Sequence, residues 1–206
     1  MLYRSTLLPA LLLSCMLFCI ACGQQEKSEP AEQMMTKSLN VGGTAAPFQG
    51  TDQNGQPWQL DKDFTKDYLV VYFYPAAMTG GCTAQACGFR DSKSELDKYN
   101  VDVVGISGDE VDGLKYFQKA NGLNFTLLSD NDGSIAKQFS VPIGGGSTME
   151  REIDGKKVSW KRDVTASRWT FVLDKSHKVV LKNTEVDAAN DSKAVLAFLE
   201  KVQKKM

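Results

Sequence analysis

The sequence predicts an α/β domain of three layers, with a central mixed sheet flanked by helices. Short apolar segments of strand length alternate with amphipathic segments of helix length from about residue 69 onward. The alternation ends in a pair of strands and a final amphipathic helix. This order of elements fits a sheet whose connecting helices cover its faces.

The first expected elements are a hairpin and a buried strand. Residues 48–60 carry Asn54-Gly55, the strongest short hairpin signal, so we expect an N-terminal β-hairpin. Residues 69–75 read LVVYFYP, a run whose length and Val, Tyr and Phe content favour a buried strand. Pro75 is expected to end this strand, because proline cannot donate to the ladder of a central strand.

Two βα units are expected next. A helix opens at Cys82, and the residues of its expected buried face are Ala84, Ala86, Phe89, Leu96 and Tyr99. Residues 101–107 then form a second strand. Asp109 is expected to cap a helix that runs to Asn121.

The remaining segments complete the sheet and its cover. We expect a strand over residues 125–128, a short helix over 132–139, a strand pair over 169–174 and 179–182, and a last helix from about Asn190. Residues 142–162 contain three consecutive glycines and a later Asp-Gly turn. We interpret them as a small exposed hairpin, a surface excursion from the domain.

Composition limits the function classes. A chain of 206 residues, 42% of them hydrophobic, can bury one substantial core and leave an appendage. The 24 basic and 25 acidic residues give a net charge of −1. Without a broad positive field, we expect no nucleic-acid partner.

The N-terminal segment is predicted to direct export. Residues 1–21 have one cation and an apolar core of signal-peptide length, and the ending Ile20-Ala21-Cys22 resembles the lipobox of bacterial lipoproteins. We expect a lipidated Cys22, a flexible polar tether over 22–40 and a folded domain over 41–206. An ordinary cleaved secretory peptide and an uncleaved signal anchor are the alternatives. The expected product is a membrane-anchored lipoprotein that faces the periplasm or the cell exterior.

Two cysteines, Cys82 and Cys87, fall within the predicted domain, and the other three lie in the N-terminal segment. Cys82 stands where a strand gives way to a helix, and the free N–H groups and dipole of a helix start favour a thiolate. The alternative for Cys82 is an inert core residue. The single histidine, His177, falls in a predicted turn, so neither a closed zinc site nor a Cys–His catalytic pair is expected. We expect no metal and no cofactor.

The loop before the helix carries a recognisable motif. Pro75-Ala-Ala-Met-Thr79-Gly-Gly-Cys82 resembles the P-x-x-x-T-x-x-C motif of the peroxiredoxins. The second cysteine, five residues later, resembles their bacterioferritin-comigratory, or PrxQ, subgroup. That subgroup usually has proline where Gly80 or Gly81 stands, a departure that loosens the loop.

The resemblance extends from about Val41 to the C-terminus. It includes the entry segment VGGTAAPFQGTDQNGQPWQL and the strand SRWTFVLDKSHKVV. In that strand Arg168 matches the position of the family's catalytic arginine.

The resemblance implies a thioredoxin-like fold and a thiol-specific peroxidase. Cys82 would attack hydrogen peroxide or an organic hydroperoxide and become a sulfenic acid, and Cys87 would resolve it as a disulfide. A thioredoxin-like thiol reductant would then restore both thiols. Thr79, Arg168 and Pro75 complete the implied catalytic set, and we expect a monomer.

Other interpretations are available for these residues. Thr79 could act only as a helix N-cap, and Arg168 could form a structural ion pair with Asp or Glu. The main alternative function is a membrane-tethered thiol–disulfide oxidoreductase, although such proteins use C-x-x-C and four residues separate these cysteines. A copper-delivery protein and a noncatalytic binding module are weaker alternatives.

Overall fold

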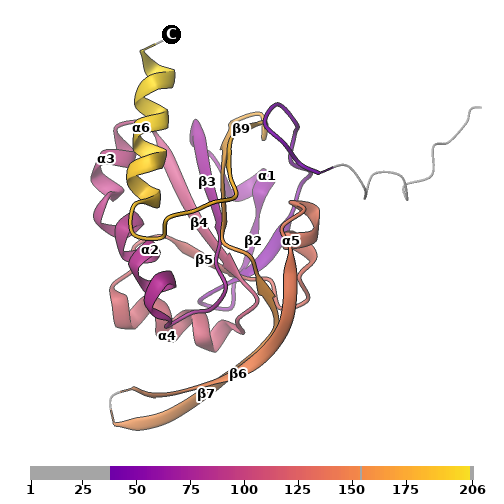
Figure 1. Cartoon of the computed structure of the whole chain (residues 1–206), viewed down its shortest axis with the longest axis vertical. Helices are drawn as coiled ribbons and strands as arrows, with labels where there is room; N and C mark the ends of the chain where they lie inside the picture. The colour runs from indigo at the N-terminus through magenta and orange to yellow at the C-terminus, as the bar shows by residue number, and fades with distance from the viewer. Residues whose placement is uncertain (1–37, 154, 205–206) are drawn as a thin grey trace, which may run out of the picture. The chain divides into compact units, whose positions relative to one another are not determined.

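The computed structural model describes residues 38–153 and 155–204, and its central feature is a mixed sheet of seven strands in the order β2-β1-β5-β4-β3-β8-β9 (Figure 1). The strands are β1 (Gln49–Asp52), β2 (Pro57–Gln59), β3 (Tyr68–Phe73), β4 (Val101–Ser107), β5 (Thr126–Ser129), β8 (Trp169–Asp174) and β9 (Val179–Asn183). The three central strands β3, β4 and β5 are parallel, whereas β1, β2, β8 and β9 pair antiparallel. The predicted signal peptide and Cys22 lie outside the described residues.

Helices lie on both faces of this sheet, so the predicted three-layer α/β architecture is confirmed (Figure 1). They are α1 (Leu60–Asp63), α2 (Gly80–Asp91), α3 (Lys93–Asp97), α4 (Val111–Asn121), α5 (Ser134–Gln138) and α6 (Asp191–Gln203). The expected N-terminal hairpin is also confirmed, as β1 and β2 with their turn at Asn54-Gly55.

The alternation of side chains along β3 explains the two cores. Val70 and Tyr72 belong to the cluster that also holds Phe89 of α2 and Leu199 of α6. The residues between them point to the opposite face of the sheet, where Phe73 packs in a second cluster with Phe139, Phe171 and Leu128. A strand buried on both faces is apolar throughout, and this continuous apolar run is why β3 could be predicted from the sequence.

The helix predicted to open at Cys82 is shorter than expected. It begins at Gly80 and ends at Asp91, and a break at Ser92 separates it from α3. Leu96 therefore lies in α3 and Tyr99 follows it, while Ala84 is exposed. The Ser92 hydroxyl donates to Ser192 Oγ at 3.0 Å, so the break is fixed against α6.

The hairpin expected within residues 142–162 is confirmed, but the interpretation of these residues as a small surface excursion is wrong. They belong to a long hairpin, β6 (Ile143–Ile153) and β7 (Lys156–Ala166), which forms a separate two-stranded sheet. Its outer part is exposed, as expected, and curves away below α4 in Figure 1. Its base is not, because Trp160 is 2% exposed and Arg162 is 6% exposed.

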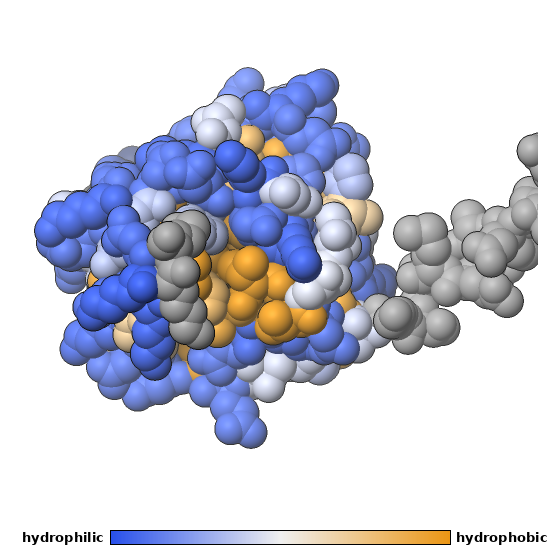
Figure 2. All heavy atoms as spheres, turned by 90° about the horizontal axis from the view of Figure 1, so that it is seen from above, coloured by the Kyte–Doolittle hydropathy of each residue, from blue (hydrophilic) through white to orange (hydrophobic). Residues whose placement is uncertain are grey.

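The face of the molecule seen in Figure 2 is mostly hydrophilic. Hydrophobic residues gather there in a central area and in a smaller group near the top of the view. Among the described residues, Val41 is the large hydrophobic side chain that is mostly exposed, at 61%. No helix within residues 38–153 and 155–204 is both long enough and apolar enough to span a bilayer.

Candidate active site

Cys82 lies in the first turn of α2 and is 1% exposed. The loop from β3 delivers it there, because β3 ends at Phe73 and the helix begins at Gly80, two residues earlier than predicted. The first N–H groups of a helix have no partner within it, and they carry the positive end of its dipole. The site therefore combines a buried sulfur with backbone donors.

Arg168 reaches Cys82 from the residue before β8. Its Nη2 donates to Cys82 Sγ at 3.2 Å, and its Nη1 donates to Gln85 Oε1 at 2.5 Å. Among the residues that the structure describes, the hydrogen bonds of this guanidinium go to a sulfur and an amide oxygen rather than to a carboxylate, although its charge acts to lower the pKa of Asp191. The predicted neighbours Arg168 and Cys82 are brought together although they are 86 residues apart.

A polar network that the sequence did not reveal holds Arg168 in place. Gln85, fully buried on α2, accepts from the guanidinium and donates through Nε2 to Asp191 Oδ2 at 2.7 Å. Thr170 Oγ1 donates to the same carboxylate oxygen at 2.7 Å. Burial raises the pKa of Asp191 above the ordinary range of a carboxyl, although hydrogen bonds from Thr170 and Gln85 lower it.

Thr79 precedes α2 but does not cap it with its side chain. Its Oγ1 donates to the Ala76 carbonyl oxygen at 2.9 Å, and its own carbonyl accepts from Thr83 N at 2.8 Å. The N-cap alternative is therefore wrong for the hydroxyl, whose lone pairs can still accept a hydrogen bond. Pro75, the other predicted member of the set, lies half-buried in the same loop.

Asp109 does not cap α4, contrary to the prediction. Glu110 is the N-cap residue, and Asp109 is 0% exposed with its carboxylate turned inward. Arg162 Nη1 donates to Asp109 Oδ1 at 3.0 Å, and the Ala77 N–H donates to Oδ2 at 2.8 Å. An acidic residue just before a helix resembles a cap in the sequence, and nothing local indicates a partner 53 residues away.

Tyr72 belongs to the same hydrophobic cluster as Cys82, a placement that was not predicted from the sequence. Its ring stacks on Phe89 of α2 at 5.0 Å, and its hydroxyl has no hydrogen-bond partner within the described residues. Burial raises the pKa of Tyr72 well above its usual value, and negative charge at Cys82 raises it further. The phenol therefore stays protonated near the sulfur. Strand periodicity was the available signal, since it places Tyr72 and Val70 on one face.

Cys87 lies on the same unbroken helix as Cys82, is half-buried, and both thiols are free. Five residues of α-helix rise about 7.5 Å and turn about 140°, which separates the two Cα atoms by roughly 8–9 Å. Bridged cysteines rarely exceed about 7 Å between Cα atoms. A disulfide between them requires α2 to change shape.

His177 occupies the predicted turn between β8 and β9, with a φ of 61°, and its Nδ1 is 3.6 Å from Asp61 Oδ1. It is only partly solvated. Among the residues that the structure describes, no three His, Cys, Asp or Glu side chains are grouped as metal ligands.

Comparisons with known proteins agree on one family. The sequence model of the AhpC/TSA family matches residues 41–182. Peroxiredoxin Bcp of Escherichia coli K12 is 40% identical over 162 residues, which are 79% of this chain and 96% of that protein. The chloroplastic peroxiredoxin Q of Sedum lineare is 42% identical over 143 residues, 69% of this chain and 68% of that protein.

Solved structures are similar as well. Peroxidoxin BcpB from Mycobacterium tuberculosis superposes with a TM-score of 0.67 at 34% identity, over 80% of this chain and 98% of that chain. Peroxiredoxin Q from Xanthomonas campestris gives 0.60 at 30% identity, over 75% of this chain and 90% of that chain. The predicted thioredoxin-like fold is confirmed by these neighbours.

Proposed function

We propose that Cys82 is the peroxidatic nucleophile of this protein and that Cys87 is its resolving thiol. The premise is that the chain belongs to the AhpC/TSA family, as a peroxiredoxin of the Bcp/PrxQ group. Peroxiredoxins of this group are oxidoreductases of the thioredoxin-dependent peroxidase class. The observation that carries this proposal is the 3.2 Å contact from Arg168 Nη2 to Cys82 Sγ in the first turn of α2. A guanidinium and the free N–H groups of a helix start both stabilise negative charge that develops on an atom beside them.

In the first step the Cys82 thiolate attacks the terminal oxygen of hydrogen peroxide or an organic hydroperoxide. A sulfur–oxygen bond forms, the oxygen–oxygen bond breaks, and the leaving oxygen departs with the electron pair and takes a proton to give water or an alcohol. The Thr79 hydroxyl and the first N–H groups of α2 orient the peroxide, and Arg168 stabilises the charge that shifts onto the leaving oxygen. The sulfur is left as a sulfenic acid.

In the second step the Cys87 sulfur attacks the sulfenic sulfur, water is released, and a Cys82–Cys87 disulfide forms. The separation of the two Cα atoms on α2 means that the helix unwinds before this step. A thioredoxin-like dithiol reduces the disulfide and becomes oxidised itself. The thiol–disulfide oxidoreductase alternative is not favoured, since its two sulfurs meet at one helix start and these do not.

The order of the steps makes the two cysteines unequal. The Cys82→Ser variant should not consume peroxide, whereas Cys87→Ser should react once and stop as a sulfenic acid. Each reduced protein is mixed with one equivalent of hydrogen peroxide, and the intact mass is measured: wild type should lose two hydrogens, and Cys87→Ser should gain one oxygen. Equal loss of the first turnover in both variants would refute the assignment.

We also propose that the protein is exported and held at a membrane by lipid on Cys22, because the Ile20-Ala21-Cys22 sequence resembles a lipobox. Several acyl chains on one cysteine would anchor the protein stably, at about 0.8 kcal/mol for each buried methylene. The Cys22→Ala variant should leave the membrane fraction while the isolated domain keeps its peroxidase activity. Continued membrane retention of a correctly processed variant would contradict lipidation.

A further inference from the structure

One peptide group in the loop between β3 and α2 is held on both sides. The Ala77 N–H donates to Asp109 Oδ2 at 2.8 Å, and the Ala76 carbonyl accepts from Thr79 Oγ1 at 2.9 Å. This carbonyl and this N–H belong to the same planar unit, so they rotate together. Any rotation of the plane that breaks the bond to Asp109 therefore also moves the acceptor that orients the Thr79 hydroxyl.

Asp109 has one orientation available to it. Its Oδ1 accepts from Arg162 Nη1 at 3.0 Å and from Trp160 Nε1 at 2.9 Å, and its Oδ2 accepts from Ser107 Oγ at 2.9 Å as well as from Ala77. Four donors fill the acceptor sites of a carboxylate. Two of these donors, Trp160 and Arg162, come from strand β7 of the hairpin.

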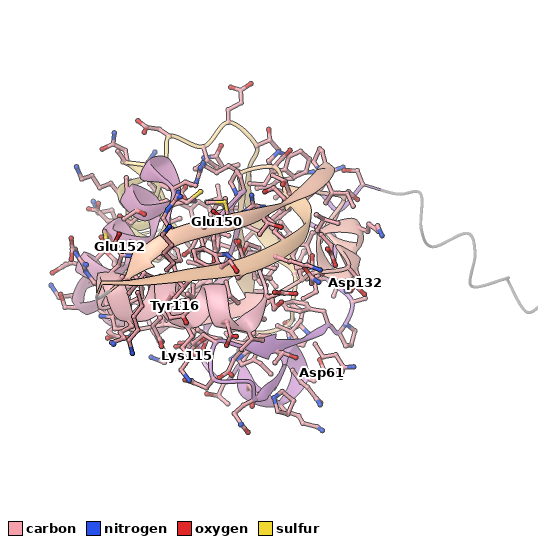
Figure 3. The ribbon with its side chains drawn as sticks, turned by 90° about the horizontal axis from the view of Figure 1, so that it is seen from below. Asp61, Lys115, Tyr116, Asp132, Glu150 and Glu152 are labelled. Carbon is pink, nitrogen blue, oxygen red and sulfur yellow. The ribbon has the colours of Figure 1, made fainter. Side chains whose placement is uncertain are left out.

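The base of β7 is joined to this region along several residues. The Glu110 N–H donates to the Lys161 carbonyl at 3.0 Å, and the Lys161 N–H donates to Glu110 Oε2 at 2.9 Å. A Cβ at Gly108 would lie 2.1 Å from the Val164 carbonyl oxygen, so only glycine allows this approach. Figure 3 shows the hairpin crossing over α4, the helix that carries Lys115 and Tyr116.

Arg162 is itself oriented by the rest of the hairpin. Its Nε donates to Thr165 Oγ1 at 3.2 Å, and its Nη2 donates to Ser147 Oγ at 2.6 Å on β6. With Nη1 on Asp109, all three guanidinium nitrogens have partners. Ser147 of β6 and Thr165 of β7 thus both help to hold the Arg162 guanidinium toward Asp109.

The loop that receives this support is strained. Met78, between the held peptide group and Thr79, has a φ of 62°. Such a backbone conformation is unfavourable for a residue with a side chain, and it persists only where the surroundings determine it. The hydrogen bonds on either side of the Ala76–Ala77 peptide help to hold the backbone in this conformation.

We propose that the β6–β7 hairpin is a positioning arm of the active site, in which Arg162 and Trp160 act through Asp109 and the Ala76–Ala77 peptide to aim the Thr79 hydroxyl at the peroxide. The inference rests on the proposed function, because it assigns to Thr79 a contact with the substrate. None of the three positioning residues touches a reacting atom. Their effect is therefore expected to pass through Thr79, and to appear in the reaction with peroxide rather than in reactions of Cys82 that do not use the Thr79 hydroxyl.

A double-mutant cycle of Arg162→Met and Thr79→Val tests this coupling. The second-order rate constant for oxidation of Cys82 by hydrogen peroxide is measured by stopped flow, and the rate of Cys82 alkylation by iodoacetamide is measured in a Cys87→Ser background. In the presence of Thr79, Arg162→Met should slow oxidation by roughly 10- to 100-fold, the range of losses from misplaced groups. In the Thr79→Val background the same change should have an effect below about twofold, and alkylation should stay within about twofold throughout.

Arg151→Met is the matched control, because Arg151 lies on the exposed part of β6 and its guanidinium donates to the carbonyl oxygen of its neighbour Glu150. It should leave both rates unchanged. If Arg162→Met does not fold, Trp160→Phe takes its place in the double-mutant cycle with Thr79→Val. Trp160→Phe removes one hydrogen-bond donor to Asp109 while keeping an aromatic ring. Losses that multiply in the double variant, or that appear equally in alkylation, overturn the inference. A wild-type protein that does not react with peroxide overturns the proposed function instead.

Discussion

Two buried carboxylates support the active site, and they are satisfied to different degrees. Each carboxylate oxygen of Asp109 accepts two hydrogen bonds, and one of these four bonds comes from the Arg162 guanidinium. Asp191 accepts from Gln85 and Thr170 on Oδ2 alone, and its Oδ1 has no partner among the described residues. The first carboxylate supports the loop that precedes α2, and the second supports α2 itself and Arg168.

The difference indicates which side of the site moves. A fully paired buried carboxylate is costly to disturb, because every partner is left unsatisfied when it leaves. Asp191 loses only the Gln85 contact when α2 unwinds, and it keeps Thr170. Asp191, with fewer hydrogen bonds, thus holds the helix α2, which changes shape in the proposed cycle. Asp109, with all its acceptor sites filled, holds the loop before α2, which keeps its shape.

The largest effect that separates the two carboxylates should be on stability. Asp109→Ala leaves a buried cation, Arg162, without its partner, so we expect it to lower the free energy of unfolding by about 3–5 kcal/mol. Asp191→Ala removes hydrogen bonds from two neutral groups and should cost about 1–3 kcal/mol. Denaturant unfolding of both variants with reduced thiols measures this, and equal losses would show that the two supports do not differ.

Hydrogen exchange should sharpen the comparison next. Amides of residues 83–91 should exchange at least about 100-fold faster in the disulfide form than in the dithiol form, because the helix must unwind to let Cys82 and Cys87 meet. The Ala77 amide, bonded to Asp109, should be equally protected in both forms. Unchanged exchange over 83–91, with the disulfide verified by mass, would contradict the unwinding.

The smallest effect concerns pH. Burial raises the pKa of Asp191 in the folded state, so the native protein binds more protons than the unfolded chain above pH about 4, and the contribution of Asp191 to stability falls as the pH rises through this window. Asp191→Asn should therefore gain stability relative to wild type as the pH rises from about 4 toward neutrality. The difference between the two stability curves isolates Asp191, since Asp130, another buried carboxyl with a raised pKa, contributes to both. A flat difference would contradict the assignment.

The sequence was most informative where the structure is local. The strands β3 and β4, the Asn54-Gly55 turn and the position of Cys82 at a helix start all follow from short patterns of hydrophobicity and turn residues. The Ser92 break was missed because Leu96 and Tyr99 continue a helical pattern that the chain does not follow.

The supporting residues of the site could not be found in this way. Asp109 and Asp191 both stand next to a helix start, where an acidic residue needs no further explanation. Their partners Arg162 and Gln85 lie 53 and 106 residues away in the chain. Only the folded arrangement of β7 and α2 shows that these carboxylates face inward.

The break at Ser92 has a consequence for the electrochemistry of the enzyme. If forming the disulfide requires unwinding of α2, the free energy of folding of that one helix becomes part of the reduction potential, and the break confines the unwound segment to the residues before α3. For a two-electron couple, each 1.4 kcal/mol corresponds to about 30 mV. A substitution that stabilises α2 by that amount would raise the potential of the Cys82–Cys87 couple by about 30 mV, so the local stability of twelve residues sets how oxidising the enzyme is.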